Sequence, residues 1–208
     1  RTFLSAGFYA PLQQAVVDRI SALKIENLLD IGCGEGYYTD AMQKEVLQCV
    51  GVDIAKNAVQ VAAKRNKQVT WIVATGATLP VLNESIDLCT SLFSPIPQDE
   101  ILRVLKPQGY LMVVTPAPEH LYAMREGLFD EVNPHEPHKF VEQLQTHFEL
   151  IEQPIIETTF DLNQVELKSL IAMTPYAYKA KAEKRLALEA QEKTSLKAAF
   201  QILIFKKK

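Results

Sequence analysis

The sequence has the size and composition of one α/β domain. Its 208 residues are 48% hydrophobic and 23% charged, as is ordinary for a globular protein with a sizeable core. It contains no run of 18 apolar residues, and its first residues lack the basic, apolar and small-residue order of a signal peptide. We therefore expect a single cytoplasmic domain over residues 1–208 that does not associate with membranes.

The net charge of −3 argues against a generally basic nucleic-acid-binding protein, but the charge is unevenly distributed. Residues 179–208 carry nine Lys or Arg and three Glu, whereas the rest of the chain carries 13 Lys or Arg and 22 Asp or Glu. This basic segment ends in Lys206-Lys207-Lys208. It is either a solvated surface or a surface that contacts the phosphates of a nucleic acid, and composition does not decide between them.

The first half of the chain predicts alternating strands and helices. Apolar residues at helical spacing over 11–23 indicate an N-terminal helical segment within residues 1–25. Strands are expected at 27–31, up to Asp53, at 69–74 and at 87–92, with helices at 37–47 and 56–66. This βαβ alternation demands a parallel sheet.

The second half predicts the edge of the same sheet. A helix at 98–105, a fifth strand at 109–115 and a helix at 119–129 precede a proline-broken loop at 133–138. A sixth strand is expected at 148–160 and a seventh, antiparallel strand at 200–205. A helical insert at 161–197, divided at Pro175, separates them. The expected fold is a doubly wound, mostly parallel seven-stranded α/β sheet with an antiparallel last strand.

A glycine-rich turn lies between the first strand and the helix after it. Residues 28–36 read Leu-Leu-Asp-Ile-Gly-Cys-Gly-Glu-Gly, and Asp53 follows Gly32 by 21 positions. An acidic residue at this distance is where a doubly wound sheet binds ribose hydroxyls. The glycines come at every second position and do not match the dinucleotide fingerprint. The turn therefore predicts a nucleotide cofactor without a pyrophosphate, with a ligand-free strand-to-helix connection as the alternative.

Later segments resemble the class I S-adenosylmethionine-dependent methyltransferases, a Rossmann-like family. After the glycine turn come Leu79-Pro80, the Ser-Ile-Asp-Leu of 85–88 and the Leu-Lys-Pro-Gln-Gly-Tyr-Leu of 105–111, in the order in which that family has them. The resemblance implies S-adenosylmethionine as cofactor and S-adenosylhomocysteine as product.

The resemblance to methyltransferases gives expected roles to residues in the glycine turn and after the next two strands. Asp53 takes the ribose hydroxyls, Glu35 reaches the methionyl ammonium, and Asp30 orders the turn through backbone N–H groups. Thr75 stands where many relatives have an Asp that accepts the adenine amino group, and the backbone around Gly76 and Leu79 would share that contact. Three glycines let the chain pass close to the cofactor, namely Gly32, Gly34 and Gly36.

A closer resemblance is to the bacterial 23S rRNA guanine-N1-methyltransferases. It is carried by the segment 3–12, by the glycine turn as far as Thr39, by 115–121 and by Met173-Thr174-Pro175. It implies an rRNA substrate and cofactor contacts from Tyr9, Gly34, Glu35 and His120. In that family an N-terminal zinc module precedes the segment that matches Arg1. This sequence shows no such module, so we expect it either to have been removed or never to have been present.

The acceptor side is less fully specified. Phe93, Ser94 and Pro95 follow the fourth strand, where base-methylating relatives place residues that meet the acceptor, and Phe93 could stack on a base. Guanine N1 carries a proton at neutral pH, so a base must take it. The candidates are Glu126, Asp130, Glu131, His135 and His138. Neither these histidines nor Cys33, Cys49 and Cys89 have the spacing of a metal or disulfide site, so no metal is expected.

Two alternative functions stay open. One is a methyltransferase of a small acceptor such as a quinone precursor, because Leu79-Pro80 and Lys106-Pro107 also occur in such enzymes. The other is a non-catalytic regulatory domain that binds S-adenosylmethionine. The sequence also leaves open which guanine is methylated and the oligomeric state, with a homodimer as one alternative.

Overall fold

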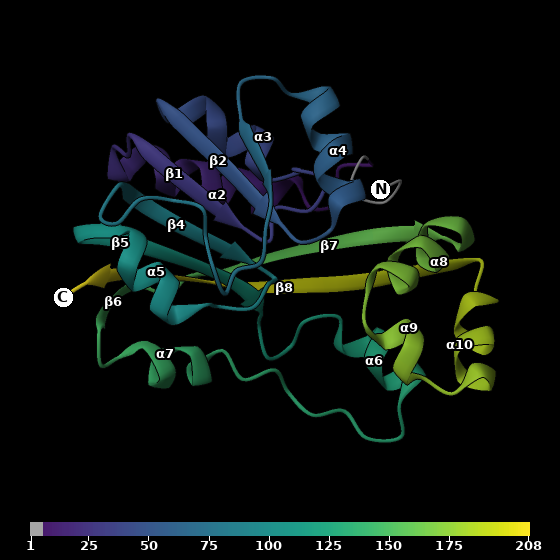
Figure 1. The fold of residues 1–208 in the computed structure, drawn as a ribbon. Helices are drawn as coiled ribbons and strands as arrows, with labels where there is room; N and C mark the ends of the chain where they lie inside the picture. The colour runs from purple at the N-terminus through teal and green to yellow at the C-terminus, as the bar shows by residue number, and fades with distance from the viewer. Residues whose placement is uncertain (1–5) are drawn as a thin grey trace. The chain divides into compact units, whose positions relative to one another are not determined.

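A computed structural model describes residues 6–208 as two compact units (Figure 1). The sheet unit comprises Gln13–Thr115, Pro137–Pro154 and Gln201–Lys208, and the helical unit comprises residues up to Leu12, Pro116–Glu136 and Ile155–Phe200. Phe3 and Leu4 of the N-terminal resemblance lie outside the described residues. Within residues 6–208, no helix has the length and apolar character needed to span a membrane.

Five parallel strands form the centre of the sheet unit. β1 (Asn27–Ile31) pairs with β2 (Gln48–Asp53) on one side and with β4 (Ile86–Leu92) on the other. β3 (Thr70–Val73) continues the sheet beyond β2, and β5 (Leu105–Pro116) continues it beyond β4. β4 is buried along nearly its whole length, as expected for a parallel strand whose two faces are covered. The expected parallel βαβ arrangement is confirmed.

The helices of this unit follow the strands in chain order. They are α2 (Ala10–Leu23), which crosses from the helical unit, α3 (Thr39–Met42) with the short 3-10 turn η1 (Gln43–Glu45), α4 (Lys56–Arg65), α5 (Gln98–Val104) and α7 (His138–Leu144). The helix expected at 37–47 is thus shorter and ends in η1. α7 was not expected, although Phe140, Val141 and Leu144 have helical spacing and pack onto the core.

The sheet has eight strands, and not the seven expected from the sequence. The order is β3-β2-β1-β4-β5-β8-β6, and the last strand, β8 (Lys193–Lys207), runs antiparallel to β6 (Phe148–Glu152), as expected. Its expected place at the sheet edge is wrong, because β8 lies between β5 and β6. The single strand expected at 148–160 divides into β6 and β7 (Ile155–Asn163), which also pairs with β8. Pro154 lies between the two strands and interrupts the ladder, because proline has no N–H to donate. Its carbonyl still accepts a hydrogen bond from the Ile202 N–H of β8.

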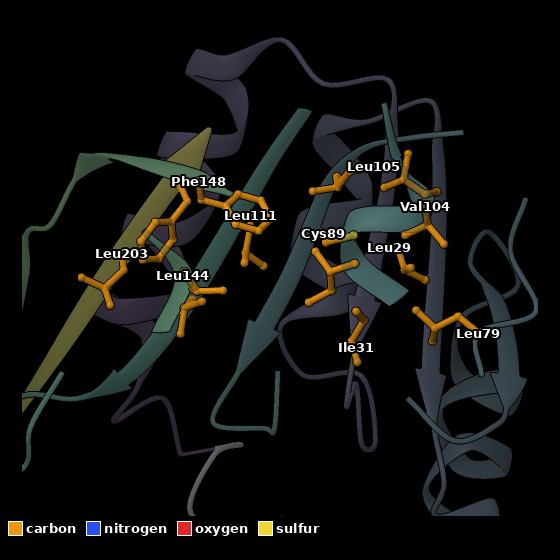
Figure 2. Packing of buried hydrophobic residues seen from close by; sticks show 14 of the residues in the cluster. Leu29, Ile31, Leu79, Cys89, Val104, Leu105, Leu111, Leu144, Phe148 and Leu203 are labelled. Atoms are coloured by element: carbon orange, nitrogen blue, oxygen red, sulfur yellow. The ribbon is translucent and has the colours of Figure 1, made fainter. Parts of the chain in front are cut away.

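Apolar side chains from strands and helices fill the core of the sheet unit (Figure 2). Leu29, Cys89 and Leu111 come from adjacent strands, while Val104 and Leu144 come from α5 and α7. Burial raises the pKa of the Cys89 thiol, so this cysteine behaves as a small apolar side chain. The core fixes the strand ends from which the site described below is built.

The helical unit contains α6 (Tyr122–Leu128), α8 (Gln164–Met173), α9 (Tyr176–Lys179) and α10 (Ala182–Glu189). α8 begins with a capping box, in which the Asn163 side chain accepts from the backbone of Glu166 and the Glu166 carboxylate accepts from the Asn163 N–H. The expected helical insert is therefore present, and Pro175 divides it. Its expected end at 197 is wrong because β8 already begins at Lys193.

Two of the three C-terminal lysines are used inside the sheet unit. The Lys207 ammonium donates to the carbonyls of Leu102 and Leu105, at 2.8 and 2.9 Å, at the end of α5. Lys208 donates to the Gln145 carbonyl at 2.6 Å, just after α7. A cation at a helix C-terminus satisfies carbonyls that the helix leaves without partners. The lysine tail thus has a structural role, which weakens its interpretation as a phosphate-contacting surface.

Candidate functional site

The glycine turn after β1 adopts a backbone that other residues rarely adopt. Gly32, Gly34 and Gly36 have φ values of +78°, +54° and +80°. A Cβ on Gly36 would lie 2.4 Å from the Trp71 ring, whereas a Cβ on Gly34 would have no atom within 4 Å. The turn is therefore closed against Trp71 at Gly36 and open at Gly34, where a ligand can approach the backbone.

Asp53, at the end of β2, holds this turn. Its two carboxylate oxygens accept hydrogen bonds at 2.8 Å, one from the Gly34 N–H and one from the Ala55 N–H. Each carboxylate oxygen has a second lone pair, so Asp53 can also accept hydroxyl donors from a ligand. Asp53, the residue expected to bind the ribose, is thus hydrogen-bonded directly to the glycine turn.

Asp30 is buried beneath the turn and has different partners from those expected. Its carboxylate accepts from the hydroxyls of Thr39, at 2.6 Å, and Thr90, at 2.8 Å, so side chains take the place of the expected backbone N–H groups. Burial raises the pKa of Asp30 from 3.8 to about 6, and the two hydroxyl bonds oppose that shift. Asp30 thereby joins β1 to the start of α3 and to β4.

A pocket of about 550 Å³ opens beside the turn, within the range of small-molecule sites. Its lining comes from the carboxyl ends of β1 to β4 and the loops after them: Ile31, Gly32, Val52, Asp53, Ile54, Ala74, Thr75, Gly76, Ala77, Phe93, Ser94, Pro95, Ile96 and Pro97. A carboxylate for hydroxyls, an open backbone at Gly34 and apolar walls for a purine suit a nucleoside such as that of S-adenosylmethionine. The residues present therefore fit the expected cofactor.

The expected adenine residues occupy different environments. Thr75 is exposed in the pocket lining, and its hydroxyl oxygen accepts from the Ala77 N–H at 3.3 Å. Leu79 lies in the core with 3% of its surface exposed, and its N–H donates to the Glu100 carboxylate at 2.6 Å. Glu35 is half-buried, and its carbonyl accepts from Arg65 at 2.6 Å.

Phe93 lines the pocket in an unusual backbone conformation. Its φ is +55°, which is rare for a bulky residue and costs free energy, and its N–H donates to the Val114 carbonyl at 2.9 Å. The side chain remains 45% exposed. Ser94, in contrast, is anchored, because its hydroxyl donates to the Ile31 carbonyl at 2.8 Å. Phe93, Ser94 and Pro95 thus line the same pocket as Asp53.

Tyr9 and His120 pack against the same residue of the helical unit although they are far apart in sequence. Both rings contact Phe200, with centroid separations of 5.0 Å for Tyr9 and 4.8 Å for His120. His120 Nδ1 lies 3.0 Å from the Ala199 carbonyl oxygen. Burial, and then the neighbouring His135, lower the pKa of His120 to about 3, so its imidazole is neutral at physiological pH.

The candidate bases are dispersed. His135 Nε2 lies 2.8 Å from the Tyr176 hydroxyl in the helical unit. Asp130 accepts from Lys181 at 2.9 Å and Lys184 at 2.5 Å. Glu126 and Glu131 are exposed in the helical unit, and His138 begins α7 in the sheet unit. Within residues 6–208, no three His, Cys, Asp or Glu side chains are grouped so that they could hold a metal ion.

Arg125 is a buried charge that the sequence did not reveal. Only 4% of its surface is exposed, and it donates to the carbonyls of Asn133, at 2.8 Å, and Pro118, at 2.9 Å. These bonds fix the loop that carries His135. An arginine in a short helix reads as a surface residue, so no sequence signal pointed to this role.

The raised pKa of Asp30 predicts a pH-dependent stability. Its contribution to folding is fully present below pH 3.8 and is lost as the pH rises through about 6. Asp30→Asn removes the ionisation but can still bond both hydroxyls. Relative to the unsubstituted chain, the free energy of unfolding of this variant should rise over that pH range, by on the order of 3 kcal/mol, and then level off. Urea titrations at several pH values measure the difference; a constant difference would contradict the assignment.

Comparison with known proteins extends these observations. Residues 29–113 match the family model described as "Methyltransferase domain". The 23S rRNA (guanine(748)-N(1))-methyltransferase of Streptomyces fradiae is 31% identical over 183 residues, which cover 84% of this chain and 65% of that protein. YxjB of Bacillus subtilis (strain 168), provisionally named a 23S rRNA (guanine-N(1)-)-methyltransferase, is 27% identical over 95% of this chain and 74% of its own length.

The fold also matches solved methyltransferase structures. The N-methyltransferase NodS from Bradyrhizobium japonicum WM9, solved in complex with S-adenosylhomocysteine, aligns with a TM-score of 0.56 at 14% identity, over 93% of this chain and 86% of NodS. At that identity the likeness concerns the fold alone. The chain therefore has the class I methyltransferase fold, with the matched methyltransferase domain at residues 29–113, and the sequence matches confirm its resemblance to the 23S rRNA guanine-N1-methyltransferases.

Proposed function

We propose that this chain transfers the methyl group of S-adenosylmethionine to N1 of a guanine in 23S rRNA. The observation that carries the proposal is the extent of the match. Similarity to the S. fradiae enzyme covers 84% of the chain, far beyond the general methyltransferase segment at 29–113. The chain spans 65% of that relative's length. The proposed substrate therefore rests on this similarity and on the residues of the cofactor and acceptor sites.

The sheet unit supplies the proposed cofactor site. Asp53 binds the ribose hydroxyls with the lone pairs that Gly34 and Ala55 leave available. Thr75 and the apolar wall at Ile54 receive the adenine, while the open backbone at Gly34 and the Glu35 carboxylate receive the methionyl part. Tyr9 and His120 contact the cofactor in this proposal, on the strength of the family resemblance. Once bound, S-adenosylmethionine supplies the electrophilic methyl carbon and the sulfide leaving group.

Phe93 and a base act on the acceptor. The exposed Phe93 ring stacks on the guanine, and Ser94 keeps the Phe93 loop attached to β1. The N1 proton passes to the base, the N1 electron pair forms the bond to the methyl carbon, and the carbon–sulfur electrons remain on sulfur. Among the candidate bases we assign this role to His135, because the Tyr176 hydroxyl, 2.8 Å from its Nε2, holds the imidazole in position.

Methyl transfer to RNA tests this function. The chain and labelled S-adenosylmethionine are incubated with unmodified 23S rRNA and, separately, with a panel of small acceptors, and the RNA is then digested to nucleosides. We expect label in 1-methylguanosine. Label only in a small acceptor would favour the alternative enzyme, and label in neither substrate, despite cofactor binding, would favour the regulatory domain.

Asp53→Ala should weaken binding of S-adenosylhomocysteine by about 1 to 3 kcal/mol, because it removes hydrogen bonds to a charged acceptor and frees Gly34. Isothermal calorimetry measures the change. Asp18→Ala, on the exposed side of α2, serves as control and should bind like the unsubstituted chain. Tight binding of NAD with no response to either methionine cofactor would overturn the cofactor assignment.

Phe93 offers a test that separates folding from acceptor binding. At φ +55° glycine is the less strained residue, so Phe93→Gly should be more stable than Phe93→Ala by about 1 kcal/mol. Both variants lack the ring, so both should bind S-adenosylhomocysteine normally and methylate RNA poorly. Thermal unfolding and RNA methylation provide the two measurements. Normal methylation by Phe93→Gly would exclude a stacking role.

A further inference from the structure

The two tyrosines of α9 have opposite environments. Tyr176 packs against Phe129, with ring centroids 5.9 Å apart, and its hydroxyl lies 2.8 Å from His135. Tyr178, two residues later, is 89% exposed. The fold therefore has no packing use for the Tyr178 ring, which presents a flat aromatic face to solvent.

Basic residues follow Tyr178 in the sequence and continue into α10. We define the α9–α10 surface by Tyr178, Lys179, Lys181 and Lys184, all within the helical unit. Figure 1 labels the two helices, α9 and α10. Lys181 and Lys184 donate to one carboxylate, Asp130, and these two lysines lower the pKa of Asp130 to about 2. The Lys181 side chain is 75% exposed, so it stays accessible while paired. One carboxylate thus gathers two ammonium groups, from lysines that follow the exposed Tyr178 closely in the sequence.

Acidic groups on the same elements limit the charge of this surface. Glu183 is exposed on α10, and Glu189 pairs with Arg185 at 3.4 Å. The lysines of the C-terminal tail differ, since Lys207 and Lys208 donate to backbone carbonyls of the sheet unit. The start of the basic segment, residues 179–184, together with the preceding Tyr178, therefore offers both exposed ammonium groups and an exposed aromatic ring.

We propose that the α9–α10 surface binds a single-stranded loop of the RNA substrate, an inference that rests on the proposed function. A base stacks on Tyr178, as aromatic residues do in single-strand sites. Phosphates take the place of the Asp130 carboxylate at Lys181 and Lys184, since a polyanion releases counterions on binding and a single carboxylate does not. Asp130 in this arrangement orders both lysines and competes with the RNA for them.

Because Asp130 would compete with RNA phosphates for Lys181 and Lys184, its removal should strengthen RNA binding. Asp130→Asn frees both lysines, so the affinity for an unmodified RNA hairpin should rise about fivefold at 0.1 M salt, with a steeper salt dependence. Lys181→Gln and Lys184→Gln should each reduce the slope of log affinity against log salt by about 0.7. Tyr178→Ala should weaken hairpin binding about tenfold and leave a duplex of equal length unaffected, whereas Tyr178→Phe should bind the hairpin normally.

Controls separate this surface from the cofactor site and from the proposed function. Every variant should bind S-adenosylhomocysteine like the unsubstituted chain, and Lys206→Gln, distant in sequence, should leave the salt slope unchanged. Unchanged or weaker RNA binding by Asp130→Asn, or equal effects of Tyr178→Ala on hairpin and duplex, would overturn the α9–α10 assignment. Neither result would count against the proposed methylation of RNA. If the unsubstituted chain binds anionic lipid vesicles and no RNA, both the surface and the proposed function fail.

Discussion

The hydrogen bond from the Gly34 N–H to Asp53 fixes the turn on which the cofactor site depends. Two further residues hold the segments on either side of the turn. Ser94 ties the loop after β4 to the Ile31 carbonyl, and buried Asp30 joins β1 to Thr39 and Thr90. The turn is thus held by residues from three other elements before any ligand arrives. A preformed site loses little conformational entropy on binding, so the free energy of its contacts is available for affinity and alignment.

The proposed function would place methyl-transfer chemistry and RNA recognition in different parts of the chain. Methyl transfer needs alignment of an acceptor with the methyl carbon and a base for one proton, which a small number of fixed side chains can provide. RNA affinity instead needs several cations that remain accessible, and their contribution falls with salt. Lys207 and Lys208 donate to backbone carbonyls of the sheet unit and stabilise it. Lys181 and Lys184 instead pair with the carboxylate of Asp130 in the helical unit. Net charge alone could not reveal this division.

The sequence predicted the central strands and the glycine turn because their signals are local. β1 and β4 are short apolar runs, and Asp53 stands at a fixed distance from Gly32. It failed where the structure depends on distant partners. The division between β6 and β7 reflects pairing of both with β8, and the Asp30 bonds come from residues 9 and 60 positions away. The buried role of Arg125 depends on carbonyls in irregular loops, for which no periodic pattern exists.

A structure of the chain bound to S-adenosylhomocysteine tests the central claim most directly. We expect ribose hydroxyls on Asp53, the adenine beside Thr75 and Ile54, the methionyl group over Gly34, and Tyr9 and His120 in contact with the ligand. Loss of the Gly34 to Asp53 bond on binding, or a ribose bound away from Asp53, would contradict it. If only Tyr9 or His120 lay beyond contact distance in a closed complex, the family-based assignment of that residue alone would be wrong.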